Sequence, residues 1–119
     1  MTDAKYFVLD ALLSPNTKDA SRKSFMKFIP FKPDFAGVHR KTKDILCFTV
    51  FRNKDKANRM MDKMMKRYWK QIEGDDWQEK LGEWWITGGG EVREFKTEEG
   101  LRKYMKRLKR GYTHPILID

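Results

Sequence analysis

Residues 45–74 read ILCFTVFRNKDKANRMMDKMMKRYWKQIEG, and this stretch holds the two clearest structural signals in the chain. Its first part, Ile45 to Phe51, is apolar at nearly every position, which predicts a central strand. From Asn53, a residue type that caps helices, apolar residues recur at spacings of three and four, and Gly74 ends the pattern. The stretch therefore predicts a buried strand followed by a long amphipathic helix.

The residues before this stretch predict two more strands. Phe35 to His39 can pair with Ile45 to Phe51 as a hairpin, because residues 40–44 form a polar turn between them. Tyr6 to Leu13 is a short apolar run closed by turn residues 14–16, which is typical of a buried strand.

Residues 17–33 fit two different structures. Thr17 can cap a short helix that runs through Lys23, whereas Phe25 to Ile29 alternate as in a strand that ends at Pro30. We favour a strand at the end of this segment.

A short helix and a second hairpin are predicted after Gly74. Asp76 has Glu79 three residues later, as in a capping box, and the helix that it begins would carry Trp77, Leu81 and Trp84 on one face. Residues 85–87 and 91–95 resemble two strand arms joined through Gly88–Gly90.

A capped helix and a short strand end the chain. Thr97 precedes two glutamates and an amphipathic pattern that extends to Leu108, and Gly111 follows. Residues 116–118 form the last predicted strand. The order of elements is not the strict alternation of a doubly wound fold. We therefore predict a single α+β domain over residues 1–119, with a mostly antiparallel sheet of about five strands and two or three helices packed on one face.

Composition places this domain in a reducing compartment. A chain of 119 residues is the size of one domain, and 39% hydrophobic residues supply a core. No apolar run approaches the roughly 18 residues that a membrane span needs, and Met1 to Leu13 does not resemble an export signal. The single cysteine, Cys47, lies in an apolar run and is expected to be a buried thiol. We expect the cytoplasm, which is the host cytoplasm if the protein is viral.

Charge is the most informative feature for function. The chain has 26 Lys and Arg residues against 17 Asp and Glu residues, a net charge of +9. Such an excess favours polyanionic partners, namely nucleic acid, an anionic membrane face or an acidic protein surface. The net charge alone does not distinguish among these partners.

The long predicted helix collects part of this charge into a ridge. At 100° per residue its cations fall within a sector of roughly 80° opposite the Met/Tyr face and extend over about 21 Å, long enough to follow several phosphates. A lysine-rich face of this kind can also be merely solvated. The cationic ridge consists of Lys56, Arg59, Lys63, Lys66 and Lys70.

The last helix adds cations over a wider arc, although the helix dipole alone accounts for those near its end. Among three closely spaced tryptophans, Trp85 is the one we select as an exposed aromatic contact. The candidate cations of the last helix are Arg102, Lys103, Lys106, Arg107 and Arg110.

Catalytic patterns are weak. His39 and His114 are far apart in the sequence and, with one cysteine, have no metal-ligand spacing. Gly88–Gly90 lacks a following helix and is better interpreted as a turn than as a phosphate loop. Glu94 and Lys96, with an aspartate at 75 or 76, resemble a nuclease metal site only by a common triplet. We expect no enzyme activity, no metal and no cofactor.

Two function classes remain. The first is a non-catalytic nucleic-acid-binding domain that contacts phosphates through the cationic ridge, with little sequence specificity. The alternative is a small inhibitor or adaptor, of the viral or phage accessory type, that docks a basic, tryptophan-containing surface on an acidic protein partner such as a nucleic-acid enzyme.

Overall fold

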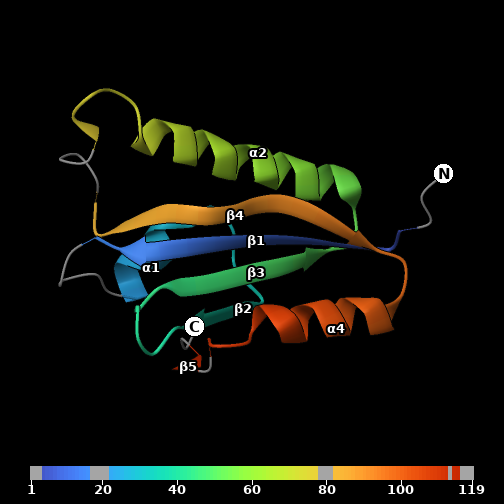
Figure 1. Cartoon of the computed structure of the whole chain (residues 1–119). Helices are drawn as coiled ribbons and strands as arrows, with labels where there is room; N and C mark the ends of the chain where they lie inside the picture. Colours follow the sequence, from blue (N-terminus) through green and yellow to red (C-terminus); the bar gives the residue numbers. More distant parts are fainter. Residues whose placement is uncertain (1–3, 17–21, 78–81, 113, 116–119) are drawn as a thin grey trace.

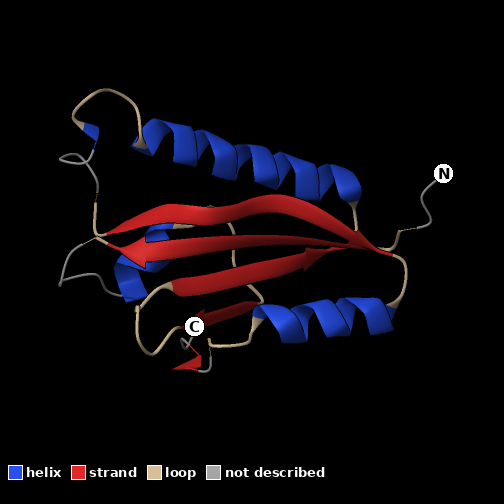
Figure 2. Cartoon of the chain, viewed as in Figure 1, coloured by secondary structure: helices blue, strands red, loops and turns tan. Residues whose placement is uncertain are grey.

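The structure, a computed structural model, describes residues 4–16, 22–77, 82–112 and 114–115. Strands and helices alternate along most of the chain (Figures 1 and 2). The elements are β1 (Tyr6–Pro15), α1 (Arg22–Phe28), β2 (Phe35–Val38), β3 (Ile45–Phe51), α2 (Lys54–Gln71), β4 (Trp84–Phe95), α4 (Glu98–Leu108) and β5 (His114–Pro115).

All neighbouring strands pair antiparallel, in the order β4-β1-β3-β2-β5. Four strands form the body of the sheet, and β5 adds only a two-residue pairing at the edge of β2, so the predicted number of about five was too high. The α+β class and the antiparallel sheet are confirmed. The connectivity up to β4 is the β-α-β-β-α-β order of ferredoxin-like domains, which by itself does not specify a function.

Helices cover both faces of the sheet. Successive side chains of a strand point to opposite faces, and on β1 Leu9 packs in a core with Met64 of α2, whereas Val8 packs with Leu101 of α4. Helix α1 lies on the same face as α2, because its Phe25 belongs to the core that contains Leu9 and Met64. In Figure 1, α2 and α4 lie on opposite sides of the strands. The prediction that the helices pack on one face therefore holds for α1 and α2 and was wrong for α4.

Both capped helices form as predicted. The Asn53 side chain accepts a hydrogen bond from the Lys56 backbone N–H at 3.1 Å, and the Thr97 hydroxyl accepts one from Gly100 at 3.1 Å. These bonds satisfy N–H groups that the first turn of a helix leaves without an internal partner. The apolar stripe of α2 is anchored by Met64, which is buried.

Helix α1 corrects the strand predicted at residues 25–29. Phe25 and Ile29 are four residues apart and both are buried, so a helix places them on one side against the sheet. The Phe25 ring meets Trp84 edge to face at 5.9 Å. A short apolar run is compatible with both the strand period of 2 residues and the helix period of 3.6, and here the packing against β4 favours the helix.

Strand β4 corrects the hairpin predicted around the three glycines. The strand continues through them and pairs with β1 along its length, with register shifts beside the glycine segment. Gly89 and Gly90 have φ of +83° and +85°, which side-chain-bearing residues rarely adopt. A Cβ at Gly89 would lie 2.7 Å from the Ala11 backbone. The glycines thus form a β-bulge rather than a turn.

Three sequence predictions concern residues outside the described ranges. The helix expected after Asp76 falls mainly on residues 78–81, the cap at Thr17 lies in 17–21, and the last strand is at 116–118. Trp84, assigned to that helix, belongs to β4. No helix in the described ranges has the length and apolar character required to cross a bilayer.

Candidate functional site

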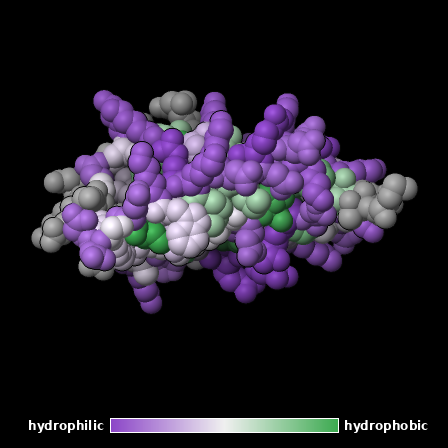
Figure 3. Space-filling view, turned by 90° about the horizontal axis from the view of Figure 1, so that it is seen from above, coloured by the Kyte–Doolittle hydropathy of each residue, from purple (hydrophilic) through white to green (hydrophobic). Residues whose placement is uncertain are grey.

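The cationic ridge lies along the outer side of α2. All five of its side chains are exposed, and none makes an ion pair with another described residue. Figure 3, seen from the side on which α2 lies, shows hydrophilic side chains projecting around a band of less polar surface. The ridge charges are therefore available to a partner.

Trp69 is the large apolar side chain that the sequence analysis overlooked. It is 60% exposed, more than any other large hydrophobic residue of the described ranges. Its ring meets Tyr68 edge to face at 5.4 Å, and it lines a shallow hollow of about 550 Å³ together with Lys66 and Lys70. At 100° per residue Trp69 falls on the flank of the apolar stripe, between Met65 and Lys66, so the spacing alone allowed either burial or exposure.

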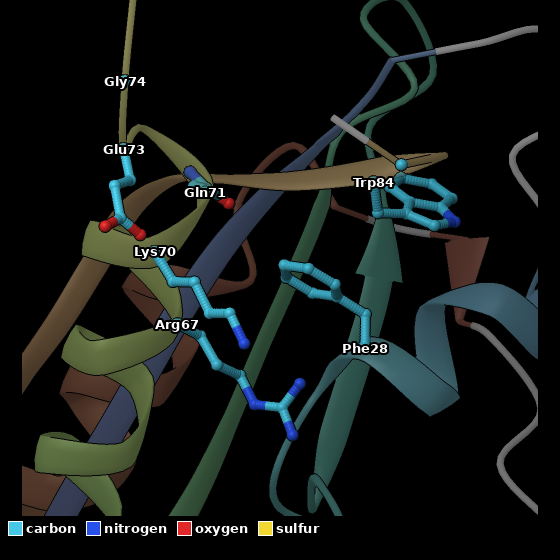
Figure 4. A pocket seen from close by; sticks show the side chains of 8 residues that line it. Phe28, Arg67, Lys70, Gln71, Glu73, Gly74 and Trp84 are labelled. Carbon is cyan, nitrogen blue, oxygen red and sulfur yellow. The ribbon is translucent and has the colours of Figure 1, made fainter. Parts of the chain in front are cut away.

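A second hollow, of about 670 Å³, lies between the ends of α1 and α2 and the start of β4. Figure 4 shows Arg67 and Lys70 extending from α2 toward Phe28. The Trp84 indole N–H donates to the Ser24 hydroxyl at 3.0 Å, which fixes the ring that closes one side. Arg67 extends the cationic surface beyond the predicted ridge, and Lys70 lines both hollows.

Gln71 ties the end of α2 to the sheet. Its side-chain N–H donates to the Ile86 carbonyl at 2.7 Å, and its side-chain oxygen accepts from the Ile86 N–H at 3.0 Å. Because β4 is an edge strand, this amide takes the place of a neighbouring strand. The contact fixes the helical turn that carries Trp69 and Lys70.

The cations of α4 do not join the ridge. They are exposed, but α4 packs on the other face of the sheet, so a partner lying along α2 does not also lie along α4. Two of them are paired within the helix: Arg102 with Glu98 at 2.6 Å and Lys103 with Glu99 at 3.3 Å. Lys106 and Arg107 of α4, and Arg110 just after it, are exposed and form no ion pair with another described residue.

Trp85 is less accessible than expected. Its side chain is half-buried, and its ring lies 5.8 Å from that of Trp77. Trp69 is therefore the better aromatic candidate.

Two of the residues considered for catalysis, Glu94 and His39, have structural partners. Glu94 forms an ion pair with Lys54 at 2.9 Å, and the His39 ring accepts the backbone N–H of Lys41 at 3.2 Å within the hairpin turn. The described ranges contain no cluster of three or more His, Cys, Asp or Glu side chains arranged to hold a metal ion. Cys47 is buried as predicted, and burial raises the pKa of its thiol.

A groove between β4 and α4 contains one perturbed carboxyl group. Asp10 lies on the α4 side of β1 in a hollow of about 1000 Å³ that it shares with Arg93 and Tyr104. Burial raises the pKa of Asp10, and the nearby Arg93 charge opposes this rise. Burial also raises the pKa of Tyr104. The groove thus contains opposite charges side by side and is less uniformly cationic than α2.

The chain matches no family model, no curated protein and no solved structure in the comparisons. The outer surface of α2 combines a line of exposed cations with an exposed tryptophan beside them.

Proposed function

We propose that this chain is a non-catalytic nucleic-acid-binding domain that contacts the phosphate backbone through the cationic ridge of α2. The observation that carries the proposal is the exposure of five cations, from Lys56 to Lys70, without an ion pair to any described residue. Over 14 residue steps the ridge extends about 21 Å, and successive phosphates of one strand are about 3.4 Å apart along a duplex. Several phosphates can therefore face it at once.

Little sequence specificity is expected from this surface. Four of the five ridge cations are lysines, whose ammonium groups act as point charges on phosphates, whereas base edges are read mainly by Arg, Asn and Gln side chains. Gln71, the glutamine at the end of α2, uses both polar atoms of its side chain on Ile86. The surface is thus suited to a backbone and not to a defined base sequence.

A salt titration with matched variants tests the proposal. Fluorescence anisotropy of a labelled 20-nucleotide DNA, single-stranded and duplex, is measured between 50 and 200 mM KCl with Lys63→Gln/Lys66→Gln. Each phosphate contact contributes about −0.7 to the slope of log K against log salt on a single strand and about −0.9 on B-DNA. The double variant should therefore reduce the slope by about 1.4 or 1.8, respectively.

The control is Lys103→Gln/Lys106→Gln on α4. It removes the same charge at the same spacing from the opposite face of the sheet and should leave the slope nearly unchanged. Equal losses from both pairs would reduce the effect to net charge, and absence of binding at tens of micromolar protein in 50 mM KCl would reject nucleic acid as the ligand. A protein partner that survives nuclease treatment would then favour the inhibitor or adaptor class.

The non-catalytic part has its own test. With Mg²⁺ or Mn²⁺ present, the same DNA should remain intact for hours, because Glu94 is paired with Lys54. Cleavage that disappears in Glu94→Gln would contradict it.

A further inference from the structure

The end of α2 combines an aromatic surface with cations on the same helical turns. Trp69 is 60% exposed and shares its hollow with Lys66 and Lys70. Lys66 and Lys70 are also members of the cationic ridge, so the hollow is continuous with the line of charge. Proteins that bind single-stranded nucleic acid combine a cationic track with exposed aromatic rings, since the phosphates lie along the charges and the bases stack on the rings.

A duplex offers no free base face that could stack on Trp69. Its bases are already stacked on one another, and only their edges reach the grooves. An unpaired base presents a free face, which an exposed indole can cover whatever the base is. The exposure of Trp69 therefore distinguishes two classes of ligand that the lysines alone do not distinguish.

We infer that α2 selects single-stranded nucleic acid, with one unpaired base stacked on Trp69 and the adjoining phosphates held by Lys66 and the ridge before it. This inference rests on the proposed function and specifies its ligand.

Charge sets the direction in which the strand leaves the ring. Glu73 lines the same hollow, and the C-terminal end of a helix carries partial negative charge. Both disfavour a phosphate beyond Lys70. The base therefore lies at the end of α2, and the backbone runs from there toward Lys63 and the start of the helix.

The test separates the base from the phosphates. Three probes of equal length are used: a 12-nucleotide oligothymidine, an abasic strand with the same phosphates, and a duplex. Affinities are measured by fluorescence anisotropy for the natural chain, Trp69→Ala and Trp69→Phe, with thermal melting as a check of folding. Trp69→Ala should weaken oligothymidine binding about 5- to 150-fold, because one stacked base is lost. Binding of the abasic strand and of the duplex should change less than about twofold, and Trp69→Phe should restore most of the affinity for oligothymidine.

The outcomes distinguish this inference from the proposed function. If Trp69→Ala leaves oligothymidine binding unchanged while Lys63→Gln/Lys66→Gln weakens it, the stacking role is rejected and the phosphate-binding function stands. An equal loss on the abasic strand would also reject stacking, because that probe has no base. If none of the three probes binds the natural chain, both proposals fail.

Discussion

Gln71 provides the sharpest test of how α2 is held in place. Gln71→Met keeps the length of the side chain and removes both hydrogen bonds to Ile86, which are 2.7 and 3.0 Å long. A neutral hydrogen bond contributes a net 0.5–1.5 kcal/mol or so, and water can reach this half-buried site, so we expect a loss of about 1–2 kcal/mol in the free energy of unfolding. With a urea m-value near 1.5 kcal/mol/M, the midpoint should fall by about 1 M.

Urea unfolding followed by circular dichroism measures this loss, with Lys66→Met as the control because Lys66 is exposed and its change should stay within about 0.5 kcal/mol. Hydrogen exchange gives a local readout, since the Ile86 N–H should exchange faster once its acceptor is gone. A midpoint shift no larger than that of the control, or unchanged exchange at Ile86, would show that Gln71 does not anchor the helix to β4.

Three further predictions concern stability. Met64→Ala should cost about 2–5 kcal/mol in urea unfolding, because this side chain is 2% exposed in the core; a loss below 1 kcal/mol would mean that the helix faces are assigned wrongly. Gly89→Ala should cost about 1–3 kcal/mol, given its φ of +83°, whereas Gly88→Ala, whose Cβ would lie 3.5 Å from Leu12, should cost clearly less. Asp10→Asn should raise the melting temperature at pH 7. Because the pKa of Asp10 is raised in the folded state, the folded protein binds this proton more tightly than the unfolded chain, and the natural chain loses stability as the pH rises from about 3.9 through the pKa of the folded state. The difference in melting temperature between the variant and the natural chain should therefore vanish below pH 3.

Helix boundaries could be predicted from the sequence because their causes are local. Asn53 and Thr97 accept backbone hydrogen bonds from residues three positions later, an interaction that needs no tertiary contact. The exposure of the ridge follows from the period of 3.6 residues in the same way. Gln71 could not be assigned a role, because its partner Ile86 is fixed by the packing of α2 on the edge of the sheet.

The position of α4 depends on a tertiary choice, yet the strands contained evidence for it. Phe7, Val8 and Leu9 are consecutive and all buried, and a strand buried at consecutive positions needs cover on both faces. A sheet with helices on one side only would leave Val8 and Phe48 in water. Leu101 of α4 packs against these two residues, so burial of apolar surface places the last helix on the face that α1 and α2 do not cover. The same apolar runs that identified β1 and β3 as interior strands therefore required a helix on each side, and this separates the cations of α4 from the ridge of α2.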